Sequence, residues 1–301
     1  TRRLDAAAAR RYTSTMLTLV TGATGLIGNG LARRLVADGV PVRALVRDVA
    51  RARPLLPGVE LVAGDITDPG SLAPAMAGVA RVFHAAGMPE QWQRDDRVFD
   101  RVNHQGTVNV LAAARTAGVA RVIYTSTMDV FAAARGGTLV ETNLDPHPKH
   151  TAYERSKQAA DRAVAAACAG GQDVVSINPG AVYGPGPVHV ALNGVFIRLL
   201  NGDVPMLPPG GMAVAYIDGV IDAHLAAAER GRAGERYLVA DTYASMRELA
   251  SAIAAPRGDR VPRTAPGWLL RVIATVSAPL ARTFGFTPLI APGQLTFLQW
   301  Q

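Results

Sequence analysis

Cysteine is nearly absent from this sequence. Cys168 is the only cysteine among the 301 residues. A single thiol cannot form a disulfide within the chain, and it cannot supply the several thiolates that zinc and iron–sulfur sites need. We therefore expect no internal disulfide, and we predict no metal site.

Lysine is the second scarce residue. Lys149 and Lys157 are the only lysines, and the other 29 of the 31 basic residues are arginine. The formal net charge of +7 first suggests a nucleic-acid partner, because basic proteins attract phosphate. The arginines are nevertheless spread along the chain, and no helix-turn-helix, zinc-finger or RNA-binding signature accompanies them. We therefore predict no nucleic-acid partner.

Long hydrophobic runs are also missing. No uninterrupted apolar run approaches the roughly 20 residues of a membrane-spanning helix. The most apolar stretch, Trp268–Leu280, contains Arg271 and Pro279. Residues 1–15 are polar and rich in arginine, without the apolar core of a secretory signal. We treat them as an N-terminal extension and predict a cytoplasmic protein without stable membrane insertion.

The sequence does contain the alternation of a βαβ protein. Hydrophobic residues make up 49% of the chain and charged residues 18%, which is enough apolar material for a sizeable core. Ile27, Leu31 and Leu35 recur at four-residue spacing and predict a helix that ends at Gly39. Apolar strand patterns alternate with such helical patterns. The expected strands are 17–21, 42–46, 59–63, 81–84, 122–126 and 174–177.

This alternation predicts an α/β fold, a Rossmann-like doubly wound parallel sheet, over residues 16–178. After Asn178 the alternation of strand and helix patterns ends, and Pro- and Gly-rich stretches separate short elements. Residues 179–301 are therefore expected to form mostly a smaller C-terminal lobe that binds the substrate.

A glycine-rich turn follows the first expected strand. It reads TGATGLIG from Thr21 to Gly28 and leads directly into the predicted helix. Such a turn lets the backbone approach a pyrophosphate, and the following helix start offers free N–H groups and a partial positive charge. An ordinary glycine-rich turn is the alternative. We predict a dinucleotide site whose loop residues are Gly22, Thr24, Gly25, Leu26, Ile27 and Gly28.

Tyr153 and Lys157 form the strongest chemical signal. They lie in a helical segment, Thr151–Gly170, in which Thr151 and Glu154 have the spacing of a capping box. Their own spacing of four places the phenol and the ammonium on one helix face. A nearby cation stabilises phenolate and lowers the pKa of the phenol toward neutrality, so that Tyr153 becomes a usable acid or base. A surface pair without function is the alternative interpretation.

These motifs together resemble the short-chain dehydrogenase/reductase superfamily, and its extended branch most closely. The resemblance rests on TGxxGxxG, on YxxxK, and on NPGAVYGPG from Asn178 to Gly186, and it runs from Met16 to about Leu249. It implies an enzyme that acts on an alcohol or a carbonyl group with a nicotinamide cofactor. It also implies a homodimer, and a return of residues from about 214 to 241 to the Rossmann domain.

The same resemblance assigns roles to further residues. After the fifth expected strand, Thr127 would hydrogen-bond the substrate oxygen, with Ser126 as its neighbour and alternative. Asn103 matches an asparagine in the helix beneath the active site, and His84 is interpreted as structural rather than as a base. Cofactor contacts are implied for Asp65, Ile66, Ala85, Ala86, Gly87, Pro179 and Val182, besides Tyr153 and Lys157.

The nucleotide preference depends on the end of the second expected strand. A carboxylate there binds the ribose 2′-hydroxyl of NAD, whereas an arginine accommodates the 2′-phosphate of NADP. Val46 occupies the usual acidic position and Arg47 follows it, which resembles the NADP-preferring reductases of the family. We predict NADP(H) in preference to NAD(H), and a solvated surface arginine is the alternative.

Two absences distinguish this sequence from the nucleotide-sugar enzymes of the branch. Sugar 4,6-dehydratases follow the catalytic Thr with an Asp-Glu pair, whereas this sequence has Met128 and Asp129 and so lacks the acid. Nucleotide-sugar enzymes also carry an arginine for the diphosphate near the position of Met212. No Arg or Lys occurs here from Gly202 to Glu229, so a diphosphate would be poorly held.

The expected lobe is apolar instead, with Val195, Phe196, Leu199, Leu200, Val204, Met206 and Leu207. The resemblance is therefore closest to dihydroflavonol reductases and 3β-hydroxysteroid dehydrogenases. It implies an NADP(H)-dependent oxidoreductase that interconverts a ketone or aldehyde with an alcohol on a bulky, mostly apolar small molecule. A nucleotide-sugar epimerase and a non-catalytic NADP-binding redox sensor are the alternatives. The apolar helical stripe over Trp268–Phe286 is interpreted as core or dimer contact rather than as a lipid-facing lid.

Overall fold

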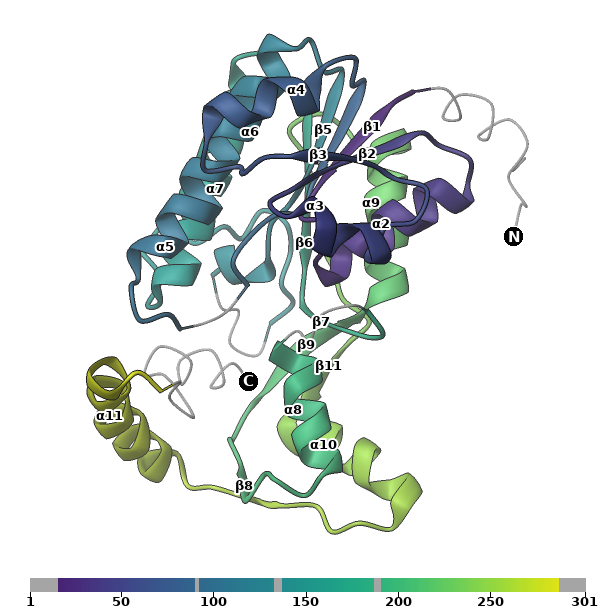
Figure 1. Cartoon of the computed structure of the whole chain (residues 1–301). Coiled ribbons are helices and arrows are strands. Elements are labelled where there is room, and N and C mark those ends of the chain that lie inside the picture. The colour runs from purple at the N-terminus through teal and green to yellow at the C-terminus, as the bar shows by residue number, and fades with distance from the viewer. Residues whose placement is uncertain (1–15, 90–91, 133–136, 187–190, 287–301) are drawn as a thin grey trace.

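The computed structural model describes residues 16–89, 92–132, 137–186 and 191–286 (Figure 1). At its centre lies a seven-stranded sheet with the order β10-β6-β5-β4-β1-β2-β3, in which every neighbouring pair is parallel. The order 3-2-1-4-5-6 is that of a Rossmann fold, and β10 extends it beyond β6. The predicted α/β class is confirmed. The strands are β1 (Thr18–Thr21), β2 (Val42–Val46), β3 (Glu60–Ala63), β4 (Arg81–His84), β5 (Arg121–Thr125), β6 (Val174–Pro179) and β10 (Arg236–Val239).

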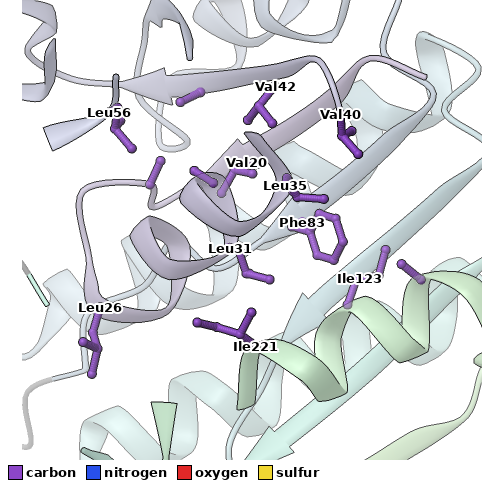
Figure 2. Close-up of a cluster of buried hydrophobic side chains, with 14 of the residues drawn as sticks. Val20, Leu26, Leu31, Leu35, Val40, Val42, Leu56, Phe83, Ile123 and Ile221 are labelled. Carbon is purple, nitrogen blue, oxygen red and sulfur yellow. The ribbon is translucent and has the colours of Figure 1, made fainter. Parts of the chain in front are cut away.

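Helices cover both faces of this sheet, because neighbouring residues of each strand point to opposite faces. Val20 belongs to the core between the sheet and helices α2 (Leu26–Ala37) and α9 (Ile217–Arg230). Figure 2 shows this core, in which Leu31 of α2 and Ile221 of α9 lie close to Phe83 of β4. Leu19 belongs to the opposite core. That core is covered by α4 (Leu72–Met76), α6 (Gly106–Thr116) and α7 (Ala152–Ala169).

Short helical segments complete the secondary structure. They are α3 (Val49–Ala52), α5 (Arg97–Phe99), the 3₁₀ turns η1 (Arg53–Leu55), η2 (Pro69–Ser71), η4 (Met128–Val130) and η5 (Ala255–Arg257), and the π-helical segment η3 (Asp100–Gln105).

A smaller lobe lies beyond the carboxyl end of β6, which runs almost directly into β7 (Figure 1). Its three-stranded sheet has the order β11-β9-β7, and a second pairing joins β8 to β12. Its elements are β7 (Ala181–Tyr183), α8 (Ala191–Leu200), β8 (Met206–Leu207), β9 (Gly211–Tyr216), β11 (Thr242–Ser245), α10 (Met246–Ala254), β12 (Arg263–Thr264) and α11 (Gly267–Phe284).

The chain crosses between the two parts more than once. Helix α9 packs on α2, and β10 pairs with β6, so residues 217–239 lie with the main sheet, whereas β9 pairs within the lobe. The division at residue 178 and the return of about 214–241 stay predictions as domain boundaries. The expected extension, residues 1–15, lies outside the described residues.

All six strands expected from the sequence exist, with ends within one or two residues of the prediction. The predicted helix also forms: α2 ends at Ala37, and Gly39 then takes a φ of +77°, which favours glycine. The apolar stripe of α11 was expected to be core or dimer contact; within the described chain it is largely exposed, and a dimer contact stays a prediction. Trp268 is 67% exposed and Val276 56% exposed, so these side chains are not part of a core among the described residues. No helix in the described ranges is long and apolar enough to cross a membrane.

Candidate active site

The glycine turn after β1 is tightly packed against the loop after β4. Gly22 has a φ of +71°, and a Cβ on it would lie 2.6 Å from the backbone N of Ala86. A Cβ on Gly28 would lie 2.2 Å from the carbonyl oxygen of Gly22. Both positions therefore require glycine, since no larger residue fits without a backbone shift. Gly25 N donates to the Gly22 carbonyl at 2.9 Å and closes the turn.

The start of α2 is open to an anion. Its N-cap is Gly25, which contributes no side-chain cap, and the first turn carries no acidic residue. The first backbone bond of the helix runs from Asn29 N to Gly25 O at 2.9 Å, so the N–H groups of Leu26 and Ile27 precede it. Free N–H groups and the positive end of the helix dipole suit a pyrophosphate. The turn, including Thr24, therefore fits the phosphates of a dinucleotide.

At the end of β2, the structure separates the two charged candidates for the ribose. Arg47 and Asp48 are both exposed, but Asp48 accepts a hydrogen bond from Arg51 N at 3.0 Å and caps α3. The Asp48 carboxylate, which follows the expected ribose position, therefore already serves as the N-cap of α3. Arg47 is the remaining charged side chain at this strand end.

At the end of β3, Asp65 and Ile66 both have local partners. The Asp65 carboxylate accepts from Thr67 N at 2.8 Å and from Thr67 Oγ1 at 2.9 Å. Ile66 is buried, and it fills the space beside Gly106, where a Cβ would lie 2.7 Å from Ile66 Cδ1. This local bonding fixes the loop in which an adenine contact is predicted.

The segment after β4 passes beside the glycine turn. Ala85 N donates to Thr21 O, and Ala86 N donates to Thr21 Oγ1, both at 3.3 Å. His84 is fully buried between Thr21 Oγ1 at 2.7 Å and Thr107 Oγ1 at 3.0 Å. Burial lowers the pKa of His84 to about 3, so the ring is neutral and ties β1 to α6. This geometry agrees with the structural interpretation of His84.

Tyr153 and Lys157 lie in the first turns of α7, where the predicted capping box forms. Thr151 Oγ1 accepts from Glu154 N at 3.0 Å, and Glu154 Oε2 accepts from Thr151 N at 2.9 Å. Tyr153 and Lys157 are 7% and 6% exposed. Lys157 Nζ donates to the carbonyl oxygen of Thr125, the last residue of β5, at 3.0 Å. The cap and this bond fix both side chains at the carboxyl end of β5.

Lys157 also lies close to the expected cofactor loop. A Cβ on Gly87 would lie 3.7 Å from Lys157 Nζ and 3.2 Å from Asn103 Oδ1. Burial lowers the pKa of Lys157 to about 8, while the nearby carboxylates of Asp161 and Asp129 oppose that shift.

The pKa of Tyr153 contradicts the expectation from the sequence. Burial raises it above the ordinary value, and the Asp129 carboxylate raises it further, while a hydrogen bond with Thr127 opposes them. This rise is the reverse of the lowering that was expected from Lys157, because the loss of solvation penalises the charged phenolate. Tyr153 is therefore a protonated phenol at neutral pH.

The structure separates the two candidate hydroxyls after β5. Thr127 caps η4, and its hydroxyl is close enough to the Tyr153 phenol to lower the pKa of that phenol. Ser126 Oγ instead donates to Asp161 Oδ1 at 3.3 Å, and the same carboxylate binds Arg236 of β10 at 2.6 Å. Thr127 is thus the hydroxyl that meets Tyr153, whereas Ser126 belongs to a structural contact beneath it.

Asn103 joins three segments around the site. It lies in the π-helical segment η3, and its Oδ1 accepts from Met88 N at 2.7 Å. Its Nδ2 donates to Ser156 Oγ of α7 at 3.0 Å. π-helical turns are frequent at functional sites. Here the amide ties the loop after β4 to the helix that carries Tyr153.

The lobe meets this site through β6 and β7. Pro179 ends β6, and Val182 lies in β7. Tyr183 of β7 packs edge-to-face on Phe196 of α8, with 5.6 Å between ring centroids, and on Tyr216, with 5.4 Å. These three aromatic side chains therefore lie at the start of the lobe, where β6 continues into β7.

Sequence reasoning missed several buried polar residues around the site. Asp129 is 4% exposed, and His224 of α9 accepts from or donates to Thr125 Oγ1 at 2.8 Å. Asn178 Nδ2 donates to the carbonyl oxygen of Thr127 at 2.9 Å. The only sequence signal for Asp129 was its place two residues after Thr127; no local pattern indicated the other two contacts. Among the described residues, no group of three His, Cys, Asp or Glu side chains is placed to hold a metal ion.

A dinucleotide turn, a Tyr and a Lys on one helix, and a hydroxyl at the carboxyl end of a parallel sheet are features typical of an enzyme that uses a nicotinamide cofactor. Residues 18–240 match the NAD dependent epimerase/dehydratase family, and the chain belongs to that family. It is an NAD(P)-dependent enzyme of the extended short-chain dehydrogenase/reductase type.

Two relatives and one solved structure illustrate the similarity. A Synechocystis protein named "Putative dihydroflavonol 4-reductase" is 33% identical over 279 residues, covering 89% of this chain and 81% of the relative. Sterol demethylase protein B of Methylococcus capsulatus is 34% identical over 275 residues, covering 89% and 83%. The crystal structure of DesIV, a dTDP-glucose 4,6-dehydratase from Streptomyces venezuelae with NAD and TYD bound, superposes with a TM-score of 0.72. It is 26% identical, and the match covers 95% of this chain and 96% of that one.

Proposed function

We propose that this protein is an NADP(H)-dependent oxidoreductase that interconverts a ketone or aldehyde with an alcohol on a bulky, mostly apolar small molecule. The observation that carries the proposal is the arrangement of Thr127, Tyr153 and Lys157. Thr127 directly follows the carboxyl end of β5 and its hydroxyl influences the pKa of the Tyr153 phenol, while the Lys157 ammonium donates to the carbonyl of Thr125, the last residue of β5. Two hydroxyl groups that can both hydrogen-bond the same substrate oxygen suit a carbonyl or an alcohol substrate.

In this mechanism the chain's own groups handle the oxygen and the proton. A bound nicotinamide supplies or accepts the hydride. Thr127 orients the substrate oxygen, and the Tyr153 phenol donates its proton to that oxygen during reduction. Because burial raises the pKa of Tyr153, the phenol is protonated at neutral pH, which is the state that reduction needs. Lys157 uses one of its three N–H donors on Thr125 and keeps the others for the cofactor ribose.

Two features support an apolar substrate. No Arg or Lys occurs from Gly202 to Glu229, so the lobe lacks the cation that a diphosphate needs in this stretch. The lobe instead has an aromatic group, Tyr183, Phe196 and Tyr216, at its start, where β6 continues into β7. The names of the two relatives, a dihydroflavonol reductase and a sterol demethylase component, also refer to bulky ring systems.

The preference for NADP(H) rests on the end of β2. Arg47 is exposed there, and Asp48 is bound to the first turn of α3. An arginine without a competing carboxylate suits a 2′-phosphate, which carries charge that the 2′-hydroxyl of NAD lacks.

The test is turnover followed by the absorbance of the reduced nicotinamide, with both cofactors. The panel contains hydroxysteroids, dihydroflavonols, aromatic and aliphatic ketones, and UDP- and dTDP-sugars. We expect NADP-linked turnover of the apolar carbonyls or alcohols alone. Conversion of a sugar nucleotide without net change of cofactor, detected by chromatography, would establish the epimerase alternative. Tight cofactor binding without any redox change would support the sensor alternative.

A homodimer and a cytoplasmic location remain part of this proposal. Light scattering on the purified full chain measures its mass in solution, and a mass of one chain would contradict the dimer. Fractionation of cells that produce the protein measures the location.

A further inference from the structure

Helix α11 carries a row of large apolar side chains that are exposed. They recur at every fourth residue from Trp268 to Phe284 and therefore follow one side of the helix, and Phe286 follows just after its end. Their side chains are between 44% and 74% exposed. The members of this exposed stripe are Trp268, Val272, Val276, Leu280, Phe284 and Phe286. Large exposed apolar patches mark contacts with another protein or with a membrane.

The side chains buried on α11 are smaller than those exposed on it. Leu270 is 5% exposed, and Ala274 and Ala281 are fully buried. Figure 1 shows the helix set apart from α8 and α10, at the edge of the lobe. The helix thus presents its bulkiest apolar residues to the outside, which costs free energy unless a partner takes them out of water.

The segment that contains the exposed stripe is basic. Residues 260–301 contain four arginines and no Asp or Glu, although the whole chain has 24 acidic residues. Arg263, shortly before α11, and Arg271, within it, are both exposed. Arginine next to an apolar face is attracted by the phosphate groups of anionic lipids. The charge of this segment therefore favours a negatively charged partner.

The length and composition of α11 suit a position on a membrane rather than across it. The helix has 18 residues, and no helix of the described chain is long and apolar enough to cross a membrane. Trp268 stands at its start and Phe284 at its end, and aromatic residues prefer the boundary between headgroups and acyl chains. An amphipathic helix with arginine beside its apolar face lies in the plane of that boundary.

A second copy of the chain fits the exposed stripe less well. Two copies that meet through α11 bring two basic segments together, and neither segment contains an acidic residue to pair with them. A stable interface also takes roughly 20–30 residues from each partner, whereas the stripe offers six apolar side chains on one helix.

We propose that α11 docks on the surface of a lipid bilayer that contains anionic phospholipids. The exposed stripe then lies among the upper parts of the acyl chains, and Arg271 lies at the level of the phosphates. This occupant takes the place of the dimer contact expected for the stripe from its sequence. The contact is superficial, so it agrees with the prediction of a protein without stable membrane insertion, and it does not depend on the proposed redox chemistry.

The experiment measures binding of the full chain to vesicles by flotation. The vesicles consist of phosphatidylcholine alone or of phosphatidylcholine with phosphatidylglycerol, at low and at high salt. We expect wild type to bind the vesicles with phosphatidylglycerol more tightly, and we expect salt to weaken this binding because it screens the arginines. Equal binding to both kinds of vesicle would overturn the assignment to anionic lipid.

Two variants test the apolar and the charged part separately. Val272→Gln combined with Val276→Gln should weaken binding to both kinds of vesicle on the order of tenfold or more, because two side chains no longer enter the bilayer. Arg271→Gln should weaken binding about fivefold, and only to the vesicles with phosphatidylglycerol.

The matched control is Val140→Gln combined with Ile197→Gln. It changes two exposed apolar residues outside α11, which are 42% and 38% exposed, and should bind vesicles as wild type does. Equal binding by the α11 valine variant and this control would overturn the proposal, and so would absence of binding by wild type. If light scattering shows that the α11 valine variant alone loses half its mass, the stripe is a contact between copies instead.

Lipid quenching of wild type decides the matter if the α11 valine variant does not fold. The chain contains three tryptophans, and Trp268→Phe removes the one in the stripe while keeping an aromatic ring there. We expect vesicles of brominated lipid to quench the tryptophan fluorescence of wild type more than that of Trp268→Phe. Equal quenching of the two proteins would contradict the proposal.

Discussion

Two lysines stand among 29 arginines, and both are buried in the region of the proposed active site. Lys149 pairs with Asp145 at 2.8 Å and also donates to the Phe131 carbonyl. Lys157 donates to Thr125 O at 3.0 Å. An ammonium is compact and presents its donors around one atom, whereas a guanidinium is planar and wider. Both lysines are buried and donate to nearby oxygen atoms, and a compact ammonium suits such positions better than a wider guanidinium.

Removal of the phenol hydroxyl tests the proposed acid. Tyr153→Phe should lower kcat by about 10²–10⁴-fold, the usual contribution of a positioned general acid, while the Kd of NADPH stays nearly unchanged. Steady-state kinetics and fluorescence titration of the cofactor measure the two quantities. Tyr237→Phe, which loses one hydrogen bond from Arg232 N at 3.2 Å, is the matched control and should keep its turnover. A fully active Tyr153→Phe enzyme would refute the mechanism.

Arg47 tests the nucleotide preference at the same scale. Arg47→Ala should weaken NADPH by about tenfold or more, because one charge-assisted contact to the 2′-phosphate is lost, and should change NADH little. Binding of both cofactors is measured by calorimetry. Arg230→Ala removes an exposed arginine at the end of α9 and should affect neither cofactor. Equal losses for NADPH and NADH at Arg47→Ala would make that residue an ordinary surface charge.

Single elements were the easiest features to predict from the sequence, because local properties decide them. The six strands are apolar runs between turn residues, and α7 begins at a capping box that Thr151 and Glu154 form by themselves. The exposed stripe of α11 shows the limit of this reasoning. Its apolar spacing predicts a helix correctly, but the spacing does not determine whether another element covers the apolar face.

The glycine turn gives a prediction for one element. Gly28→Ala should weaken dinucleotide binding and destabilise the fold by about 1–3 kcal/mol, because the new Cβ would lie 2.2 Å from the Gly22 carbonyl oxygen and the backbone must move. Gly194→Ala, inside α8 with no heavy atom within 4 Å of the new Cβ, should instead stabilise by about 0.5–1 kcal/mol. Urea unfolding measures both free energies. Unchanged stability and cofactor affinity in Gly28→Ala would contradict the close packing.

At the scale of the whole molecule, two buried histidines make the fold sensitive to acid. Burial lowers the pKa of His84 to about 3 and that of His224 to about 4. The unfolded chain binds these protons near its ordinary pKa of about 6.5, so stability is present above that pH and is lost as the pH falls. The loss is about 1.4 kcal/mol per pH unit for each histidine. We expect the free energy of unfolding to decrease from pH 7 to pH 5.

Asp129 contributes with the opposite sign. Its folded pKa of about 7 lies above the ordinary value, so its stabilisation is present at low pH and is lost as the pH rises through 7. Asp129→Asn removes this contribution and should therefore lose more stability than wild type between pH 7 and pH 5. Denaturant titrations at the two pH values measure the difference. An equal or smaller loss in the variant would contradict the raised pKa of Asp129.

The sequence by itself determined the sheet strands, the glycine turn and the position of Tyr153 and Lys157 on one helix, because periodicity, positive φ and helical spacing act within a few residues. Only the tertiary structure decided that Thr127 faces Tyr153 while Ser126 faces Asp161, which meets Arg236 from a strand 75 residues away. It also decided that Asp129 is buried and that the pKa of Tyr153 is raised. Solvation and charge depend on which distant segments pack together, and no local pattern contains that information.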